Sequence, residues 1–157
     1  MEEKLLDIGA ERAVLAGLLQ NGVDTYVNIS DLLCSESFVN PNNKIIYKCI
    51  EHIISNDQKP DVATLLAAAE QLNFIEQIST KQELNYINSL YEFPVSQDNI
   101  FSFAVQIKKF EFARKIKSLT VKVHKDMDDI NGSESINEII QKLEDPVTDF
   151  LREDDGG

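Results

Sequence analysis

The stretch QDNIFSFAVQIKKFEFARKIKSLTVKVHK, residues 97–125, decides how the rest of the chain is interpreted. It contains neither Pro nor Gly, and its apolar residues recur every three or four positions, as in a helix with a buried face. A first stripe consists of Ile100, Phe103, Ile107 and Phe110, and a second of Phe112, Ile116, Leu119 and Val123. The change of phase turns the apolar face to another side. The sequence therefore predicts one long helix that packs on two different bodies.

The residues before this stretch predict several short helices. Asn21-Gly22 is a typical helix stop, because Gly readily adopts a left-handed conformation. Pro41 suits a first helical turn, Asp61 is a candidate N-cap, and Thr80 opens a capping box. Apolar residues at helical spacing occupy residues 11–20, 26–33, 38–54, 61–72 and 80–92.

The residues after the long helix predict a second helix that returns along it. Ser135 and Glu138 match a capping box. Apolar residues follow at helical spacing: Ile136, Ile139, Ile140, Leu143, Val147, Phe150 and Leu151. Because Pro lacks an amide hydrogen, Pro146 is expected to interrupt this helix and to start a new segment.

The charges of the two C-terminal segments differ in sign. Residues 97–125 hold seven of the fifteen basic residues, whereas residues 126–155 hold eleven acidic residues against Lys142 and Arg152. This difference favours an antiparallel hairpin in which the basic helix pairs with Glu138, Glu144 and their neighbours. Exposed pairs contribute only about 0.2–1 kcal/mol each, so apolar burial has to supply the stability. The alternative, a nucleic-acid surface, is less favoured because the nearby carboxylates repel phosphates.

No segment alternates apolar and polar residues as a half-buried strand does, so the predicted fold class is all-α. We expect a globular helical head at residues 1–96, followed by a long helix and a C-terminal antiparallel helical hairpin at residues 97–151. Residues 152–157 are polar and are expected to begin a linker.

Composition limits the classes of function. The net charge of −12 argues against general affinity for phosphate backbones. The acidic N-terminus lacks a signal-peptide pattern, and no apolar run approaches the roughly 20 residues of a bilayer span. We therefore expect a soluble, cytoplasmic chain without a membrane partner. Cys34 and Cys49 form no Cys-x-x-Cys motif and are interpreted as core residues in a reducing compartment.

The sequence contains no motif that carries catalysis or binds a cofactor. Phosphate-binding loops, Gly-x-Ser-x-Gly and His-Glu-x-x-His are all absent, and His52 and His124 are the only imidazoles. Asp126, Asp128 and Asp129 fail the EF-hand pattern, because the sixth and twelfth loop positions lack Gly and Glu. We therefore predict no catalytic, cofactor-binding or metal-binding residues, and no enzymatic activity of the chain by itself.

Five segments resemble, in order, the N-terminal domain of DnaB-type replicative DNA helicases. They are ERAVLAGLL (residues 11–19), FVNPNNKIIY (38–47), PDVATL (60–65), LNYINSL (84–90) and the Asn-Ile entry to the long helix (99–107). The chain departs from the family pattern at Asn43, where His is common, at Ser79-Thr80, where Gly-Gly is common, and at Phe103, where Tyr is usual. These departures indicate a divergent member, of the kind that phages and plasmids carry.

The resemblance implies a helical head and a two-helix hairpin through which subunits dimerise. It implies that three dimers form a collar on a hexameric ring, where primase and, in some systems, the helicase loader dock. It also implies that an ATP-hydrolysing motor domain, absent from this sequence, would follow the linker that begins at residues 152–157. ATP and Mg²⁺ would bind only that motor domain, and DNA would be contacted only through the full-length ring. A primase's helicase-binding domain has a similar fold and is an alternative, as is a small acidic DNA-mimicking inhibitor or enzyme.

The expected hairpin and dimer surface consists of apolar residues from both helices, which could alternatively form a wholly intramolecular core. These residues are Phe112, Ile116, Leu119, Ile139, Ile140 and Leu143.

Overall fold

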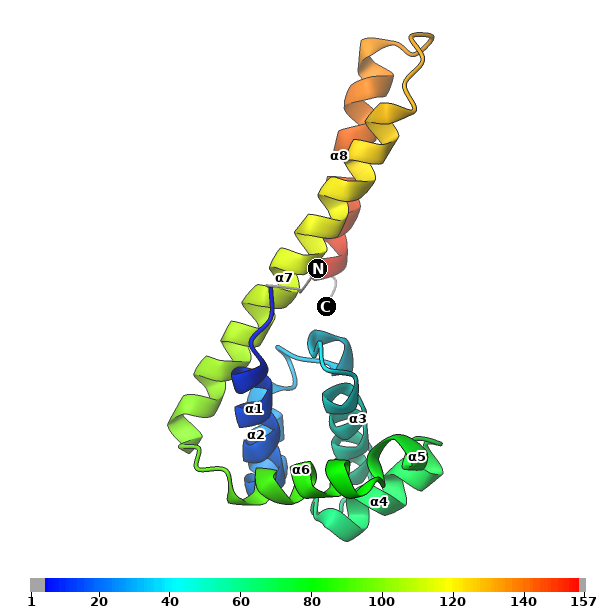
Figure 1. Cartoon of the computed structure of the whole chain (residues 1–157). Coiled ribbons are helices and arrows are strands. Elements are labelled where there is room, and N and C mark those ends of the chain that lie inside the picture. Colours follow the sequence, from blue (N-terminus) through cyan, green and yellow to red (C-terminus); the bar gives the residue numbers. More distant parts are fainter. Residues whose placement is uncertain (1–4, 156–157) are drawn as a thin grey trace. The chain divides into compact units, whose positions relative to one another are not determined.

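The computed structural model describes residues 5–155, which form eight α-helices, one short 3-10 helix and no strand (Figure 1). The all-α prediction is therefore confirmed. The elements are α1 (Ile8–Asn21), α2 (Val23–Ile29), η1 (Ser35–Ser37), α3 (Pro41–Ser55), α4 (Val62–Gln71), α5 (Ile75–Ile78), α6 (Lys81–Glu92), α7 (Gln97–Asp128) and α8 (Ile136–Asp155). Within this described part, no helix is both long enough and apolar enough to cross a bilayer.

The chain divides into two compact units, which we call unit 1 (Met1–Glu111) and unit 2 (Phe112–Gly157). The long helix α7 belongs to both, because its residues 97–111 lie in unit 1 and the rest in unit 2. The division falls where the apolar phase of α7 changes. The first stripe of α7 therefore lies in unit 1 and the second in unit 2.

The caps predicted from the sequence set most helix boundaries in unit 1. The Gly22 amide donates to the Leu18 carbonyl at 2.8 Å, and Gly22 has a φ of 63°. Pro41 occupies the first turn of α3. The Asp61 carboxylate accepts from the Thr64 amide at 2.7 Å, and the Thr80 hydroxyl accepts from the Glu83 amide at 3.2 Å. These side chains satisfy amides that have no partner inside the helix.

The second helix begins and ends earlier than the apolar pattern predicts. The expected range is 26–33, but α2 runs from Val23 to Ile29. Gly22 redirects the chain within one residue, so α2 starts directly after α1. Leu33 follows the helix in a turn, where its amide donates to the Ile29 carbonyl at 3.0 Å. Its side chain is still buried, which explains why the apolar spacing extended the predicted helix.

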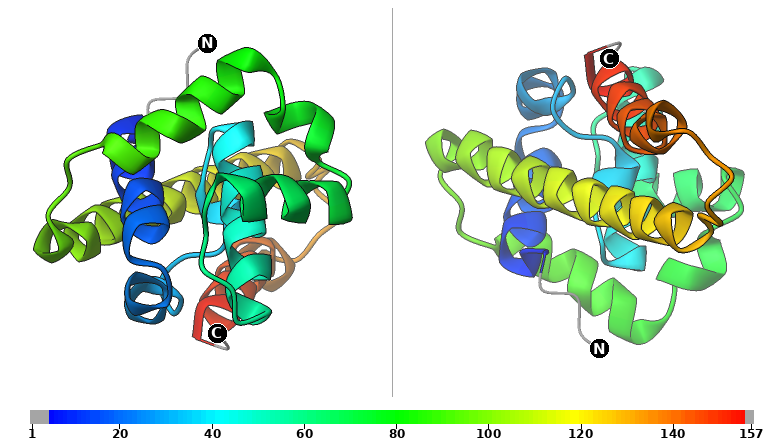
Figure 2. Two further views of the ribbon diagram at one scale, coloured as in Figure 1. Left: turned by 90° about the horizontal axis from the view of Figure 1, so that it is seen from below. Right: turned by 90° about the horizontal axis from the view of Figure 1, so that it is seen from above.

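Helix α1 contacts α2, α3 and α6, and two further views show how these helices are arranged (Figure 2). Its residues Ala13 to Leu19 are all buried. The first stripe of α7 joins this core through Ile100 and Ile107. A Cβ atom on Gly17 would lie only 2.9 Å from Ile100 Cγ1, so the absence of a side chain at Gly17 permits this close packing.

Unit 2 is an antiparallel pair formed by the second half of α7 and by α8. The predicted capping box is present: the Glu138 amide donates to Ser135 Oγ at 3.1 Å, and the Ser135 amide donates to Glu138 Oε2 at 3.2 Å. Helix α8 continues to Asp155, into the expected linker, whereas residues 156–157 lie outside the described part of the chain.

The predicted break at Pro146 is wrong, because Pro146 lies inside a continuous α8. Proline at this position removes only the hydrogen bond that would reach the Lys142 carbonyl. The side-chain amide of Gln141 donates to Asp145 Oδ1 at 2.7 Å, which links successive turns just before the proline. The apolar stripe continues on both sides and favours a single helix.

The interpretation of both cysteines as core residues is correct only for Cys49. That side chain is buried, whereas Cys34 is exposed in the loop before η1. The Cys34 amide donates to Ser37 Oγ at 3.1 Å, and this contact fixes the loop without burying the thiol. Burial raises the pKa of the Cys49 thiol to about 11.

Candidate interaction surface

An aromatic contact fixes the register of unit 2. The rings of Phe112 and Phe150 meet edge to face, with their centroids 5.7 Å apart. Leu119 lies seven residues after Phe112 and Leu143 lies seven residues before Phe150, so the two are level with each other. Of the residues predicted to form the hairpin surface, Phe112 makes this contact between α7 and α8.

Unit 2 does not bury these residues by itself. Among residues 112–153, whose exposure is described, none is buried. Phe112, Leu119 and Ile139 are half-buried along the line where the helices meet. Ile116 and Ile140 are each 46% exposed and Leu143 is 50% exposed. A two-helix pair covers only part of each apolar face, and here the remainder is open.

The apolar residues of α8 lie on one side of the helix. Ile136, Ile140, Leu143, Val147 and Leu151 follow one another in steps of three or four, which places them on a common face. We call the exposed residues Ile116, Ile140 and Leu143 the unit 2 apolar face.

The opposite side of α8 is charged. A groove between α7 and α8 is lined by Lys122, Asp126, Glu134, Glu138, Gln141, Lys142, Asp145 and Pro146. Lys122 of the basic helix and Glu138 of the acidic helix therefore line one groove, although pairing between them stays a prediction. Hydrogen bonds from the backbone amides of Glu134 itself, Asn131 and Gly132 lower the pKa of the Glu134 carboxyl. His124 Nε2 lies 3.5 Å from the Asp128 carboxylate, four residues along α7.

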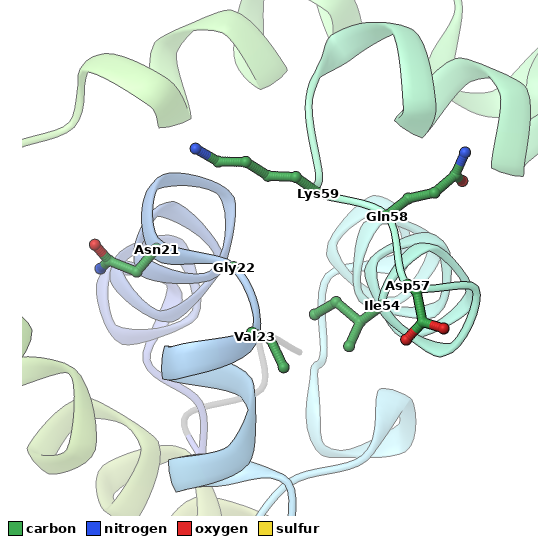
Figure 3. A pocket seen from close by; sticks show the side chains of 7 residues that line it. All are labelled: Asn21, Gly22, Val23, Ile54, Asp57, Gln58 and Lys59. Carbon is green, nitrogen blue, oxygen red and sulfur yellow. The ribbon is translucent and has the colours of Figure 1, made fainter.

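A second open site, in unit 1, was not anticipated from the sequence. We call it the α2–α3 groove, and it has a volume of about 350 Å³ (Figure 3). It is lined by Asn21, Gly22, Val23, Ile54, Asp57, Gln58 and Lys59. The side chains of Val23 and Ile54 point toward each other across it, and Lys59 extends along one side. A single surface-exposed valine gives no sequence signal, so only the fold reveals this site.

A buried polar cluster in unit 1 was also missed. Glu11 is 1% exposed, and its carboxylate accepts from the Val39 amide at 2.8 Å and from Asn43 Nδ2 at 2.9 Å. The Tyr86 hydroxyl donates to Asn43 Oδ1 at 2.7 Å. Burial raises the pKa of Tyr86, which therefore stays a donor at neutral pH. The cluster ties α1, α3 and α6 together and is enclosed by protein, so we assign it to structure.

A second buried carboxylate holds the same loop from α7. The Ser37 hydroxyl donates to Glu111 Oε1 at 2.7 Å, and Lys108 Nζ lies 3.7 Å from the same oxygen. Both residues of the hydrogen bond are nearly fully buried. Within the part of the chain that the structure describes, no group of three or more His, Cys, Asp or Glu side chains is arranged to hold a metal ion.

Comparison with known families now connects these features. Residues 3–109 match the sequence model of the DnaB-like helicase N-terminal domain. The chain therefore belongs to this family, and the match favours the helicase alternative over the primase one. Comparison with curated protein sequences gives no significant match.

Solved structures show the same fold. Twenty-eight chains match significantly, and one of them is the N-terminal domain of DnaB helicase from Mycobacterium tuberculosis. That domain superposes with a TM-score of 0.78 over 94% of this chain and 99% of its own length, at 18% sequence identity. At this identity the likeness establishes the fold.

Proposed function

We propose that this chain is a non-catalytic N-terminal domain of a replicative DNA helicase, which assembles the subunits of the ring and docks partner proteins in the cytoplasm. The unit 2 apolar face forms the dimer contact, and three dimers build the collar of a hexamer. Primase docks on this collar, as does the helicase loader in some systems. ATP and Mg²⁺ belong to the motor domain of the full-length protein, and DNA is contacted only through the complete ring.

One observation carries the proposal: the unit 2 apolar face is organised but uncovered. A helical hairpin with no buried residue among its described side chains has little internal core to stabilise it. Amphipathic helices obtain most of their stability from packing of the apolar face. Family membership supports a second copy of the chain as the covering partner, because the family consists of helicase domains.

The energetics favour self-association of moderate strength. Fully burying a Leu or Ile side chain contributes about 1.5–3 kcal/mol relative to full exposure, so each half-exposed residue of the face would add about 1 kcal/mol. Two-fold symmetry doubles every contact, because each residue occurs once in each subunit. Part of this gain is offset by the loss of translational and rotational freedom.

Replacing Ile116 with Asp tests the proposal. The variant should raise the dimer dissociation constant by tenfold or more, because a charge would have to be desolvated twice in the dimer. Light scattering measures the molar mass, and circular dichroism should show that unit 1 stays folded. The matched control is Val121→Asp. Val121 is 63% exposed and lies two and a half turns from Phe112, on the outer side of α7.

The outcomes separate the proposal from its main rival. Loss of dimers with unit 1 intact supports a contact between copies. If Ile116→Asp instead abolishes all helical circular dichroism, the residue belongs to an intramolecular core and the proposal fails. Equal effects of Ile116→Asp and Val121→Asp on dimer formation would show that the unit 2 apolar face does not form the dimer contact.

A further inference from the structure

The α2–α3 groove continues along α2 as an exposed apolar strip. Val23 is 53% exposed and Val27, one helical turn further, is 60% exposed. Ile54 of α3 is half-buried and forms the other wall of the groove. The site is open, and Val27 extends its apolar side chains by one turn of α2. Its spacing matches apolar side chains placed one turn apart on a second helix.

Carboxylates surround this strip. Asp24 and Asp57 are exposed beside Val23 and at the end of α3. Glu51 lies one turn before Ile54 and accepts from the Tyr26 hydroxyl at 3.3 Å. Lys59 is the single cation among the residues that line the groove. Unit 1 as a whole carries sixteen acidic and eight basic residues, a net charge of −8. The surroundings therefore favour an occupant with positive charge.

We propose that the α2–α3 groove and the adjoining Val27 form a docking surface for a cationic amphipathic helix of a partner protein. The partner's apolar residues contact Val23, Val27 and Ile54, and its Lys or Arg side chains face Asp24, Glu51 and Asp57. The inference rests on the proposed docking role of the chain but does not depend on dimer formation.

A pair of matched peptides tests this assignment on the whole chain. One peptide is a short amphipathic helix with leucines one turn apart and lysines between them, and the other carries glutamates in place of the lysines. Each is titrated into the ¹⁵N-labelled chain and followed by amide chemical shifts. The lysine peptide should shift Gly22, Val23, Val27 and Ile54, whereas the glutamate peptide should leave them unchanged.

Charge variants test whether the groove prefers a positively or a negatively charged partner helix. Lys59→Glu removes the single cation of the lining and should tighten binding of the lysine peptide by roughly two- to fivefold, as expected for exposed charge pairs. Asp57→Lys should weaken binding by a similar factor. A weaker complex with Lys59→Glu would show that the surface prefers an anion and would overturn the proposal.

Val27→Ser tests the apolar contact without adding a charge that would itself attract the lysine peptide. The variant should bind the lysine peptide roughly tenfold more weakly, since burial of about one branched side chain is lost. Val121→Ser in unit 2 is the control, because it places the same substitution at a similarly exposed valine. Both side chains are mostly exposed, so circular dichroism should show that both variants fold.

Two further results would contradict the proposal. Peptide-induced shifts centred on Ile140 and Leu143 would place the cationic helix on α8. Shifts of Val23 and Val27 that appear on raising the chain concentration, without peptide, would assign the groove to a second copy. Neither result is the same as failure of the proposed dimer, which light scattering reports independently.

Discussion

Leu15 in unit 1 and Leu143 in unit 2 are chemically identical, but their environments are opposite. Leu15 is fully buried inside α1, whereas half of the Leu143 surface faces outward. The same contrast holds for the two units as wholes, since unit 1 has a continuous core and unit 2 has no buried residue among positions 112–153. Helix α7 contributes residues to both units, because its apolar face changes direction between them. Unit 1 therefore has a core of its own, whereas unit 2 leaves much of its apolar surface exposed.

The largest expected effect is the difference in stability loss between truncation of Leu15 and truncation of Leu143. Leu15→Ala should lower the free energy of unfolding by about 2–5 kcal/mol, because it leaves a cavity in a packed core. Leu143→Ala should cost the dilute monomer less than about 1 kcal/mol. Urea unfolding at low protein concentration measures both, and similar losses would mean that unit 2 has a core of its own.

The buried carboxylate of unit 1 gives the next largest effect. Glu11→Leu should lower the free energy of unfolding by about 3 kcal/mol, because the Val39 amide and the Asn43 side chain lose their acceptor. The control is Glu92→Leu at an exposed position, where little change is expected. Denaturant titration compares the two. Equal stability of both variants would show that the cluster does not hold unit 1 together.

The proline inside α8 should limit the stability of unit 2 alone. Pro146→Ala restores a backbone donor and a better helix former, so it should stabilise α8 by about 1–3 kcal/mol. Hydrogen exchange should then slow for α8 amides and stay unchanged for α1 amides. If exchange slows equally in both units, the two units unfold together and do not have separate stabilities.

The two cysteines give the smallest effect on stability but a clear contrast in reactivity. Cys34 is exposed and should react readily with iodoacetamide in the native chain. Burial raises the Cys49 pKa to about 11 from the usual 9.0, so its thiolate fraction near pH 8 falls about a hundredfold. The folded state then binds the extra proton, so stability is retained below pH 9 and declines as the pH rises toward 11. Mass spectrometry should find one modified thiol in the native chain and two after unfolding.

Local signals in the sequence predicted the architecture well. Asp61, Thr80 and Ser135 cap helices as expected, because capping depends on residues only a few positions apart. The boundary between units 1 and 2 falls at the change of apolar phase in α7. Pro146 was misread, since the amphipathic face of α8 outweighs the single lost hydrogen bond.

The remaining features depend on contacts between distant residues. Glu11, Asn43 and Tyr86 come from three helices, and polar residues on amphipathic helices ordinarily face water. The α2–α3 groove joins a helix start to a helix end some thirty residues later. The exposed position of Cys34 follows from the path of a loop. No periodicity or spacing in the sequence encodes the polar cluster, the groove or the exposure of Cys34. These features can be recognised only in the folded structure.

The central claim is that unit 2 completes its core with a second copy of the chain. Light scattering of the wild-type chain, from micromolar to near-millimolar concentration, tests it most directly. We expect the molar mass to rise from 17.7 kDa toward twice that value as the unit 2 apolar faces meet. A mass that stays at 17.7 kDa over the whole range would contradict the account.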